Sequence, residues 1–247
     1  MLAHSVPRRF SLNQLPTISA AMTTTAGDKP MQTLISEIWP IVTESLMVSS
    51  SAVVISCVLG MPLGASIGLG TMPGRSILKT LIFAGMATPP VVVGLLLYML
   101  LSRSGSLGEW QWLFTSKAMI LAQVILDLPF VIGITLTAVE SLPEELCFQL
   151  RSMGATPWQI RRTLLSESRH GLMLAVTTAL GRSLSEVGAV LMVGGNVEGH
   201  TRVLTTAILL ETNRGRFTIA LSLAAILMTL AMLMNLFFVR LQNRYQR

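Results

Sequence analysis

The chain has 247 residues, of which 51% are hydrophobic and only 12% are charged, and its formal net charge is +6. Soluble domains carry about 25% charged residues, so this composition excludes an ordinary soluble enzyme, and the high hydrophobicity excludes a disordered chain. Two cysteines are too few for a disulfide framework. The basic residues lie between or beside apolar runs, where they set membrane topology rather than bind nucleic acid.

The N-terminal segment, residues 1–35, is polar and includes Arg8 and Arg9. It lacks the long apolar stretch of a cleavable signal peptide. We therefore expect a disordered tail here, and Met22 or Met31 could equally be the start of the protein.

Five apolar runs follow the tail, and a helix that spans a membrane needs about 20 mostly apolar residues. The runs cover residues 45–74, 80–102, 118–139, 171–193 and 217–239. Buried helices of a soluble core are the alternative, but five runs of this length disfavour it. The sequence predicts an all-α membrane protein with one five-span domain over residues 40–240 and a basic cytoplasmic tail over residues 241–247.

The second and third runs contain residues that are unusual inside a membrane. Pro89 and Pro90 interrupt the second run, and carbonyl groups freed at membrane depth are tolerated only against protein or water. This stretch is therefore a candidate wall of a translocation path, although helix packing alone would also explain it. Asp127 lies midway along the third run, where it could cap backbone freed by Pro129 or pair with Arg182; a metal or proton site is a lesser alternative.

The segment between the third and fourth runs predicts a helix, a turn and a second helix. Pro143 and the acidic residues after it are typical of a helix start, Gly154 of a helix end, and Pro157 of the next start. Its apolar residues, Trp158 among them, could lie on the membrane surface or dock into a groove of a partner protein. Leaving the tail aside, this side of the membrane carries more basic residues, which places the segment and the C-terminus in the cytoplasm.

The fourth run contains Arg182 and Glu186, and a charge at mid-bilayer costs about 2.5–3.5 kcal/mol on insertion scales. Residues four apart share a helix face and can pair, so the two form either a gate element of a cavity or a structural ion pair. Gly188 belongs to a face of small residues that suits helix packing, a dimer interface or a smooth pore wall.

The residues after the fourth run predict a turn, since Gly194 and Gly195 precede Asn196. Thr201 and Arg202 follow, and an arginine beside hydroxyl groups could bind an oxyanion. An ordinary solvated loop is the alternative.

Three kinds of site are not found in the sequence. None of its lysines follows a glycine, so there is no Walker A loop for ATP. Its histidines, at positions 4, 170 and 200, are too dispersed for a metal site. Paired carboxylates and nucleophile constellations of an enzyme are not found either.

Residues 151–159, Arg-Ser-Met-Gly-Ala-Thr-Pro-Trp-Gln, resemble the cytoplasmic coupling loop of ABC-importer permeases. The Glu-Ala-Ala positions of that family fall on Phe148, Gln149 and Leu150. Residues 89–97 and 181–196 resemble the second and fourth core helices of the oxyanion-importing permeases. The amino-acid sequences of residues 192–196 and 210–215 are most similar to those of the tungstate-uptake branch.

This resemblance implies the fold of an ABC type-I importer permease in the cell inner membrane, which is a transport subunit and not an enzyme. It implies a homodimer, two cytoplasmic ATPase subunits that hold ATP and magnesium, and an extracytoplasmic tungstate- or molybdate-binding protein; the chain itself would bind no cofactor and no metal. The function implied is import of an oxyanion, foremost tungstate, by alternating access. A molybdate or sulfate permease is the alternative, and a secondary transporter or a channel comes from another class.

Three groups of residues are candidates for functional roles, the first from this resemblance and the other two from the residue chemistry above. The residues expected to contact the ATPase are Met153, Gly154, Ala155, Thr156, Pro157 and Trp158. Those expected in the translocation path or its gate are Pro89, Pro90, Arg182, Glu186 and Gly188. Those expected to contact the anion or the binding protein are Asn196, Thr201 and Arg202.

Overall fold

The computed structural model describes residues 31–70 and 73–244. The chain divides into two compact units, residues 1–39 and 40–247. In the first unit the described part is the beginning of helix α2 (Met31–Leu69). Most of the segment expected to be a tail, residues 1–30, lies outside the described residues, whereas residues 31–35 belong to α2.

The second unit contains the remaining helices, and the described residues of the chain include no β-strand. The helices are α3 (Arg75–Met86), α4 (Pro90–Leu101), the short 3₁₀ helix η2 (Gly108–Trp110), α5 (Ser116–Glu140), α6 (Glu144–Ser152), α7 (Pro157–Glu167), α8 (Arg169–Ser185), α9 (Gly188–Gly194), α10 (Leu204–Asn213) and α11 (Phe217–Arg244). The expected basic tail therefore continues α11 as far as Arg244, and residues 245–247 lie outside the described residues.

Three helices of the described chain are long and apolar enough to cross a membrane, namely the part of α2 from Ile38, all of α5, and α11 as far as Phe238. The other two predicted spans are bent pairs: α3 and α4 meet at 94°, and α8 and α9 meet at 58°. The number of spans is therefore five if each bent pair counts as one crossing. Pro89 and Pro90 predicted the first break, whereas the sequence predicted α8 and α9 as one helix, because a run of apolar residues shows its length but not its direction.

Helix α5 lies at the centre of the second unit and packs against α3, α4, α8 and α9. Small residues of α2 allow close contact with α5: a Cβ atom at Gly64 would lie 2.6 Å from the carbonyl oxygen of Ile132. The side-chain amide of Gln123 donates a hydrogen bond of 3.0 Å to the carbonyl of Ser183, which ties α5 to α8. These contacts fix the positions of the helices that carry the predicted site residues.

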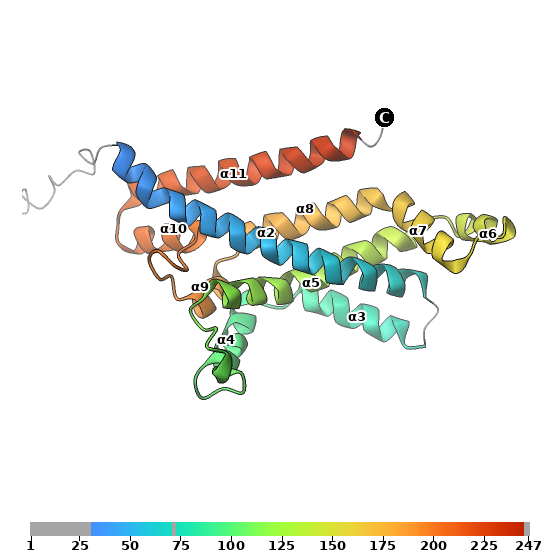
Figure 1. Cartoon of the computed structure of the whole chain (residues 1–247), viewed down its shortest axis with the longest axis horizontal. Helices are drawn as coiled ribbons and strands as arrows, with labels where there is room; N and C mark the ends of the chain where they lie inside the picture. Colours follow the sequence, from blue (N-terminus) through green and yellow to red (C-terminus); the bar gives the residue numbers. More distant parts are fainter. Residues whose placement is uncertain (1–30, 71–72, 245–247) are drawn as a thin grey trace, which may run out of the picture. The chain divides into compact units, whose positions relative to one another are not determined.

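The predicted helix–turn–helix between the third and fourth spans is confirmed as α6 and α7. Figure 1 shows this pair beyond the ends of α5 and α8. Because α6 follows α5 after only residues 141–143, and α8 follows α7 after Ser168, the pair is attached by short connections to two membrane helices.

Candidate functional site

The turn between α6 and α7 contains the six residues expected to couple to an ATPase. Gly154 has a φ of +76°, a left-handed conformation that most L-residues avoid. Its N–H donates to the carbonyl of Arg151, and the N–H of Ala155 donates to that of Leu150, which satisfies carbonyls at the end of α6. Glycine is needed for this backbone angle and not for space, because no described atom lies within 4 Å of the position of a Cβ.

The start of α7 is fixed by a reciprocal cap. The N–H of Gln159 donates to Thr156 Oγ1 at 3.4 Å, and the N–H of Thr156 donates to Gln159 Oε1 at 2.8 Å. Pro157 occupies the first helical position, where its missing N–H has no cost. A capping box of this kind holds the turn in one conformation.

The apolar side chains of α6 and α7 divide into two sets. Ile160 and Leu164 are buried and hold α7 against the rest of the chain. Phe148, Met153 and Trp158 point outward, with exposed fractions of 73%, 82% and 73%. Exposed large apolar side chains of this kind are typical of surfaces that contact a protein or a membrane.

The second candidate site is the break between α8 and α9. Helix α8 ends at Ser185, and Glu186 has an extended backbone. The Glu186 Oε1 atom accepts a hydrogen bond of 3.1 Å from the N–H of Ala189 in the first turn of α9, and the Glu186 carbonyl accepts one of 3.0 Å from Thr205 Oγ1. A carboxylate is favourable at a helix N-terminus, so Glu186 stabilises the break itself.

The proline break and the Glu186 break meet in the structure. Helix α4 begins at Pro90, directly after Pro89, and packs against α9. A Cβ atom at Gly188 would lie 2.8 Å from Val91 Cγ2, and one at Gly94 would lie 2.8 Å from the Cα of Ala189. Glycine at these two positions therefore lets the two short helices touch, and four of the five residues predicted for the path or gate gather there.

The fifth of these residues, Arg182, does not pair with Glu186 in the way their spacing indicated. Its Nε atom lies 3.6 Å from Asp127 Oδ1 of α5, and its guanidinium group lies over the ring of Phe130, 4.4 Å from the centroid. The predicted pairing with Glu186 is wrong because α8 ends before Glu186, so the two residues do not share a helix face. The alternative expectation, a pair between Asp127 and Arg182, is confirmed.

A small cavity adjoins Glu186, with a volume of about 10 Å³, which is room for about one water molecule. Most of its lining side chains are polar: Ser45, Ser49, Gln123, Ser183, Glu186 and Thr205. This cavity is far too small to pass an oxyanion.

The turn after α9 contains the third group of predicted residues. Asn196 has a φ of +52°, and the N–H of Val197 donates to Thr201 Oγ1, which in turn donates to the carbonyl of Gly194 at 2.5 Å. Arg202 forms an ion pair with the exposed Glu198 at 3.4 Å. Because the Thr201 hydroxyl donates within the turn, it is not free to donate to an anion here.

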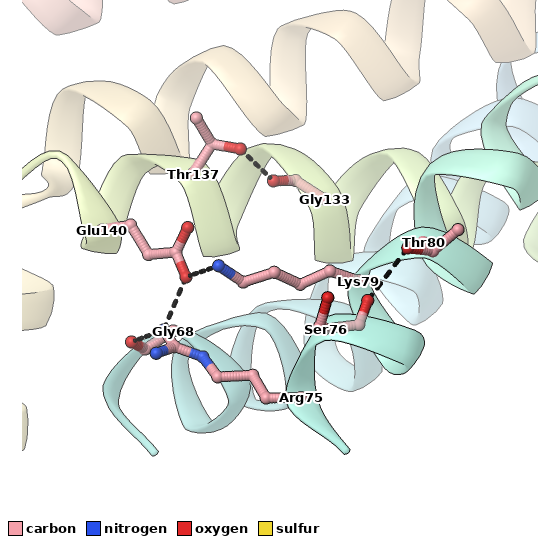
Figure 2. A network of polar contacts seen from close by, with 8 residues as sticks. All are labelled: Gly68, Arg75, Ser76, Lys79, Thr80, Gly133, Thr137 and Glu140. Carbon is pink, nitrogen blue, oxygen red and sulfur yellow. Dashed lines mark hydrogen bonds and ion pairs between the residues drawn. The ribbon is translucent and has the colours of Figure 1, made fainter. Parts of the chain in front are cut away.

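A further polar cluster was not predicted from the sequence. Glu140, the last residue of α5, is contacted by two cations of α3: Arg75, whose Nη2 lies 2.5 Å from Glu140 Oε1, and Lys79. Figure 2 shows the two basic side chains converging on this carboxylate. In the sequence, Arg75 and Lys79 are interpreted only as basic residues that set the membrane topology. The available signal is that both precede the second apolar run and that Glu140 directly follows the third.

Metal-binding groups of three or more His, Cys, Asp or Glu residues do not occur among residues 31–70 and 73–244. The predicted sites of the described chain thus comprise one exposed apolar turn, one polar break within the membrane helices, and one hydrogen-bonded turn at the end of α9.

Comparisons with known proteins bear on this arrangement. Residues 60–247 match the family model described as "binding-protein-dependent transport system inner membrane component". A "probable anion ABC transporter permease protein" of Haloferax volcanii is 41% identical over 205 residues, covering 81% of this chain and 88% of the relative. The tungstate uptake system permease protein TupB of Peptoclostridium acidaminophilum is 34% identical over 207 residues, covering 84% and 91%.

Among solved structures, a bacterial ABC transporter involved in the import of alginate aligns with a TM-score of 0.75 at 20% identity, covering 92% of this chain and 87% of that one. At this identity the likeness concerns the fold alone. It confirms the predicted fold, an all-α ABC type-I importer permease.

Proposed function

Since the chain belongs to the family of binding-protein-dependent transport system inner membrane components, we propose that it carries tungstate across the inner membrane as the permease of an ATP-driven importer. The chain is a transport subunit and not an enzyme. The observation that carries the proposal is the α6–α7 turn, whose left-handed Gly154 and capped Thr156 present Met153 and Trp158 outward. Because the chain belongs to this family, we interpret the exposed apolar surface as a docking site for a cytoplasmic ATPase. ATP and magnesium would be bound by that ATPase and not by this chain.

An oxyanion as substrate is supported by the two relatives, one of which is named for anions and the other for tungstate. The resemblance of residues 192–196 and 210–215 to the tungstate branch favours tungstate over molybdate and sulfate. An extracytoplasmic binding protein would deliver the anion near α9 and α10, which lie at the opposite end of the second unit from α6 and α7 (Figure 1).

The polar break supports transport by alternating access. Asp127 and Glu186 place two carboxyl groups beside the one guanidinium group of Arg182, and a carboxylate repels a dianion. These residues therefore close the path to a dianion in this state instead of binding it. Passage requires that α8 and α9 move at the Glu186 break, where hydrogen bonds between side chains and backbone replace the continuous helix.

A homodimer is part of this proposal. The cavity beside Glu186 within one chain holds about one water molecule, so a path wide enough for an oxyanion needs a second set of walls. Gly181 and Ser185 form a small-residue patch exposed on α8, and patches of this kind let membrane helices from two chains approach closely.

The experiment is uptake of labelled tungstate by cells lacking this chain and by cells in which it is restored, with molybdate and sulfate as competitors. Restored uptake that resists excess molybdate supports the tungstate assignment. Equal competition by molybdate would leave a general oxyanion permease, and no difference on restoration would contradict the substrate assignment.

A further inference from the structure

The Arg75–Lys79–Glu140 cluster has no assigned role in transport. We propose that Glu140 is a positioning residue that makes the ends of α2, α3 and α5 move together with the α6–α7 turn. This inference rests on the proposed function, because it concerns how movement of an ATPase would reach the membrane helices.

The cluster joins three helix ends through few atoms. Arg75 Nη2 contacts Glu140 Oε1 at the end of α5, and it also donates to the carbonyl of Gly68 in the last turn of α2. Lys79 contacts the same oxygen of Glu140 from one turn further along α3. Figure 2 shows Arg75 reaching both Gly68 and Glu140, so a single guanidinium group links α2 and α5.

The charges in this cluster are placed against the dipoles of their own helices. Arg75 is a cation at the first position of α3, and Glu140 is an anion at the last position of α5, whereas helix N-termini favour anions and C-termini favour cations. Each charge is therefore unfavourable for its own helix and is offset by its contacts with another. The Gly68 carbonyl, at the C-terminal end of α2, gains a favourable cation from Arg75. Such an arrangement stabilises the junction between helices and not the helices alone.

The position of the cluster connects it to the coupling turn. Helix α6 begins four positions after Glu140, and the connection is itself hydrogen-bonded: the N–H of Ser141 donates to Thr137, and that of Leu142 donates to Val139. A displacement of α6 therefore pulls on Glu140 within a short, ordered stretch. Because Glu140 is tied to Arg75 and Lys79, the displacement is shared with α2 and α3. Without the cluster, α5 would move by itself.

The test uses the complete importer, with its ATPase and binding protein, reconstituted in lipid vesicles. The variants are Glu140→Gln, which keeps the side-chain shape but removes the charge, and Arg75→Lys, which keeps the charge but removes the flat guanidinium. The matched control is Glu109→Gln, which removes the charge of an exposed glutamate in η2, a segment outside the cluster. Anion uptake and ATP hydrolysis are measured in the same vesicles.

A second readout does not depend on the anion. Spin labels at Ser66→Cys on α2 and Glu145→Cys on α6, in a background lacking the native cysteines, report the distance between the two helices with and without ATP. A purely structural role for Glu140 would change the yield or the thermal stability of the complex, but it would not make this distance depend on ATP.

We expect the distance to stay constant in the parent protein and to change on ATP addition in Glu140→Gln. We also expect the number of anions carried per ATP to fall about threefold or more in Glu140→Gln, to fall less in Arg75→Lys, and to stay unchanged in Glu109→Gln. Unchanged transport per ATP together with a constant distance in both cluster variants would overturn the inference. If the parent protein carried no tungstate, the proposed function would fail, while the label distances would still decide the role of Glu140.

Discussion

Arg182 of α8 and Asp127 of α5 pair inside the helical core, with Arg182 Nε 3.6 Å from Asp127 Oδ1. Asp127 is 1% exposed, and removing one partner of a buried pair leaves the other charge uncompensated. The contact joins the central helix α5 to the helix that ends at the Glu186 break.

The first prediction concerns this pair. Asp127→Asn or Arg182→Gln alone should lower the free energy of unfolding by about 3 kcal/mol, because each leaves one charge unpaired. The double variant should recover part of that loss, since neither charge remains. Denaturant unfolding of the purified permease in detergent, analysed as a double-mutant cycle, measures the coupling. Losses that simply add would show that the two side chains do not interact.

The second prediction concerns the left-handed turn at Gly154. Gly154→Val should abolish transport, because a β-branched residue is strongly disfavoured at a φ of +76°. Gly154→Asn should retain most of it, since asparagine adopts this conformation at low cost. Both variants should insert into the membrane normally, which immunodetection in membrane fractions checks. Equal transport by the two variants would exclude a role for the turn conformation.

The third prediction concerns the exposed apolar surface of α6 and α7. Trp158→Ala should weaken association with the ATPase at least about tenfold, as expected for a central aromatic side chain of an interface. It should leave the thermal stability of the permease alone unchanged, because the side chain is 73% exposed. Trp110→Ala, an exposed tryptophan of η2 outside the α6–α7 pair, is the matched control and should bind the ATPase normally. Co-purification at graded ATPase concentrations provides the measurement, and normal binding by Trp158→Ala would place the docking surface elsewhere.

The fourth prediction concerns the contact between α2 and α5. Gly64→Ala should destabilise the permease by about 1–3 kcal/mol, because the added methyl would lie 2.6 Å from a backbone oxygen that cannot move freely. Ser66→Ala, two positions further along α2, is the control: its side chain is exposed, so alanine should be close to neutral in this helix. Thermal unfolding of the two variants side by side checks the difference. Equal stability would mean that α2 is packed more loosely than the structure shows.

Local signals in the sequence predicted part of this arrangement. Pro143, Gly154 and Pro157 fix helix starts and ends through their own backbone restrictions, and they placed α6 and α7 correctly. Pro89 and Pro90 likewise predicted the interruption before α4. In each case the proline or glycine lies within a few residues of the helix start or end that it determines.

The break at Glu186 could not be predicted in the same way, because no proline causes it. It depends on a Glu186 side chain that caps α9 and on a bond from Thr205, which lies 19 positions away. The partner of Arg182 and the contacts of Glu140 are also long-range, as Arg75 and Glu140 are 65 positions apart. Spacing along one helix therefore predicted Glu186 as the partner of Arg182, whereas in the folded chain its partner is Asp127 of another helix.

Transport by an ATP-driven importer is best tested by tungstate uptake into vesicles containing the permease, its ATPase and the binding protein, with ATP or a non-hydrolysable analogue supplied on the ATPase side. We expect uptake that requires hydrolysable ATP and is lost in Gly154→Val but kept in Gly154→Asn. Uptake that proceeds equally with the analogue, or without the ATPase, would contradict the proposed function and would indicate a channel or a secondary transporter.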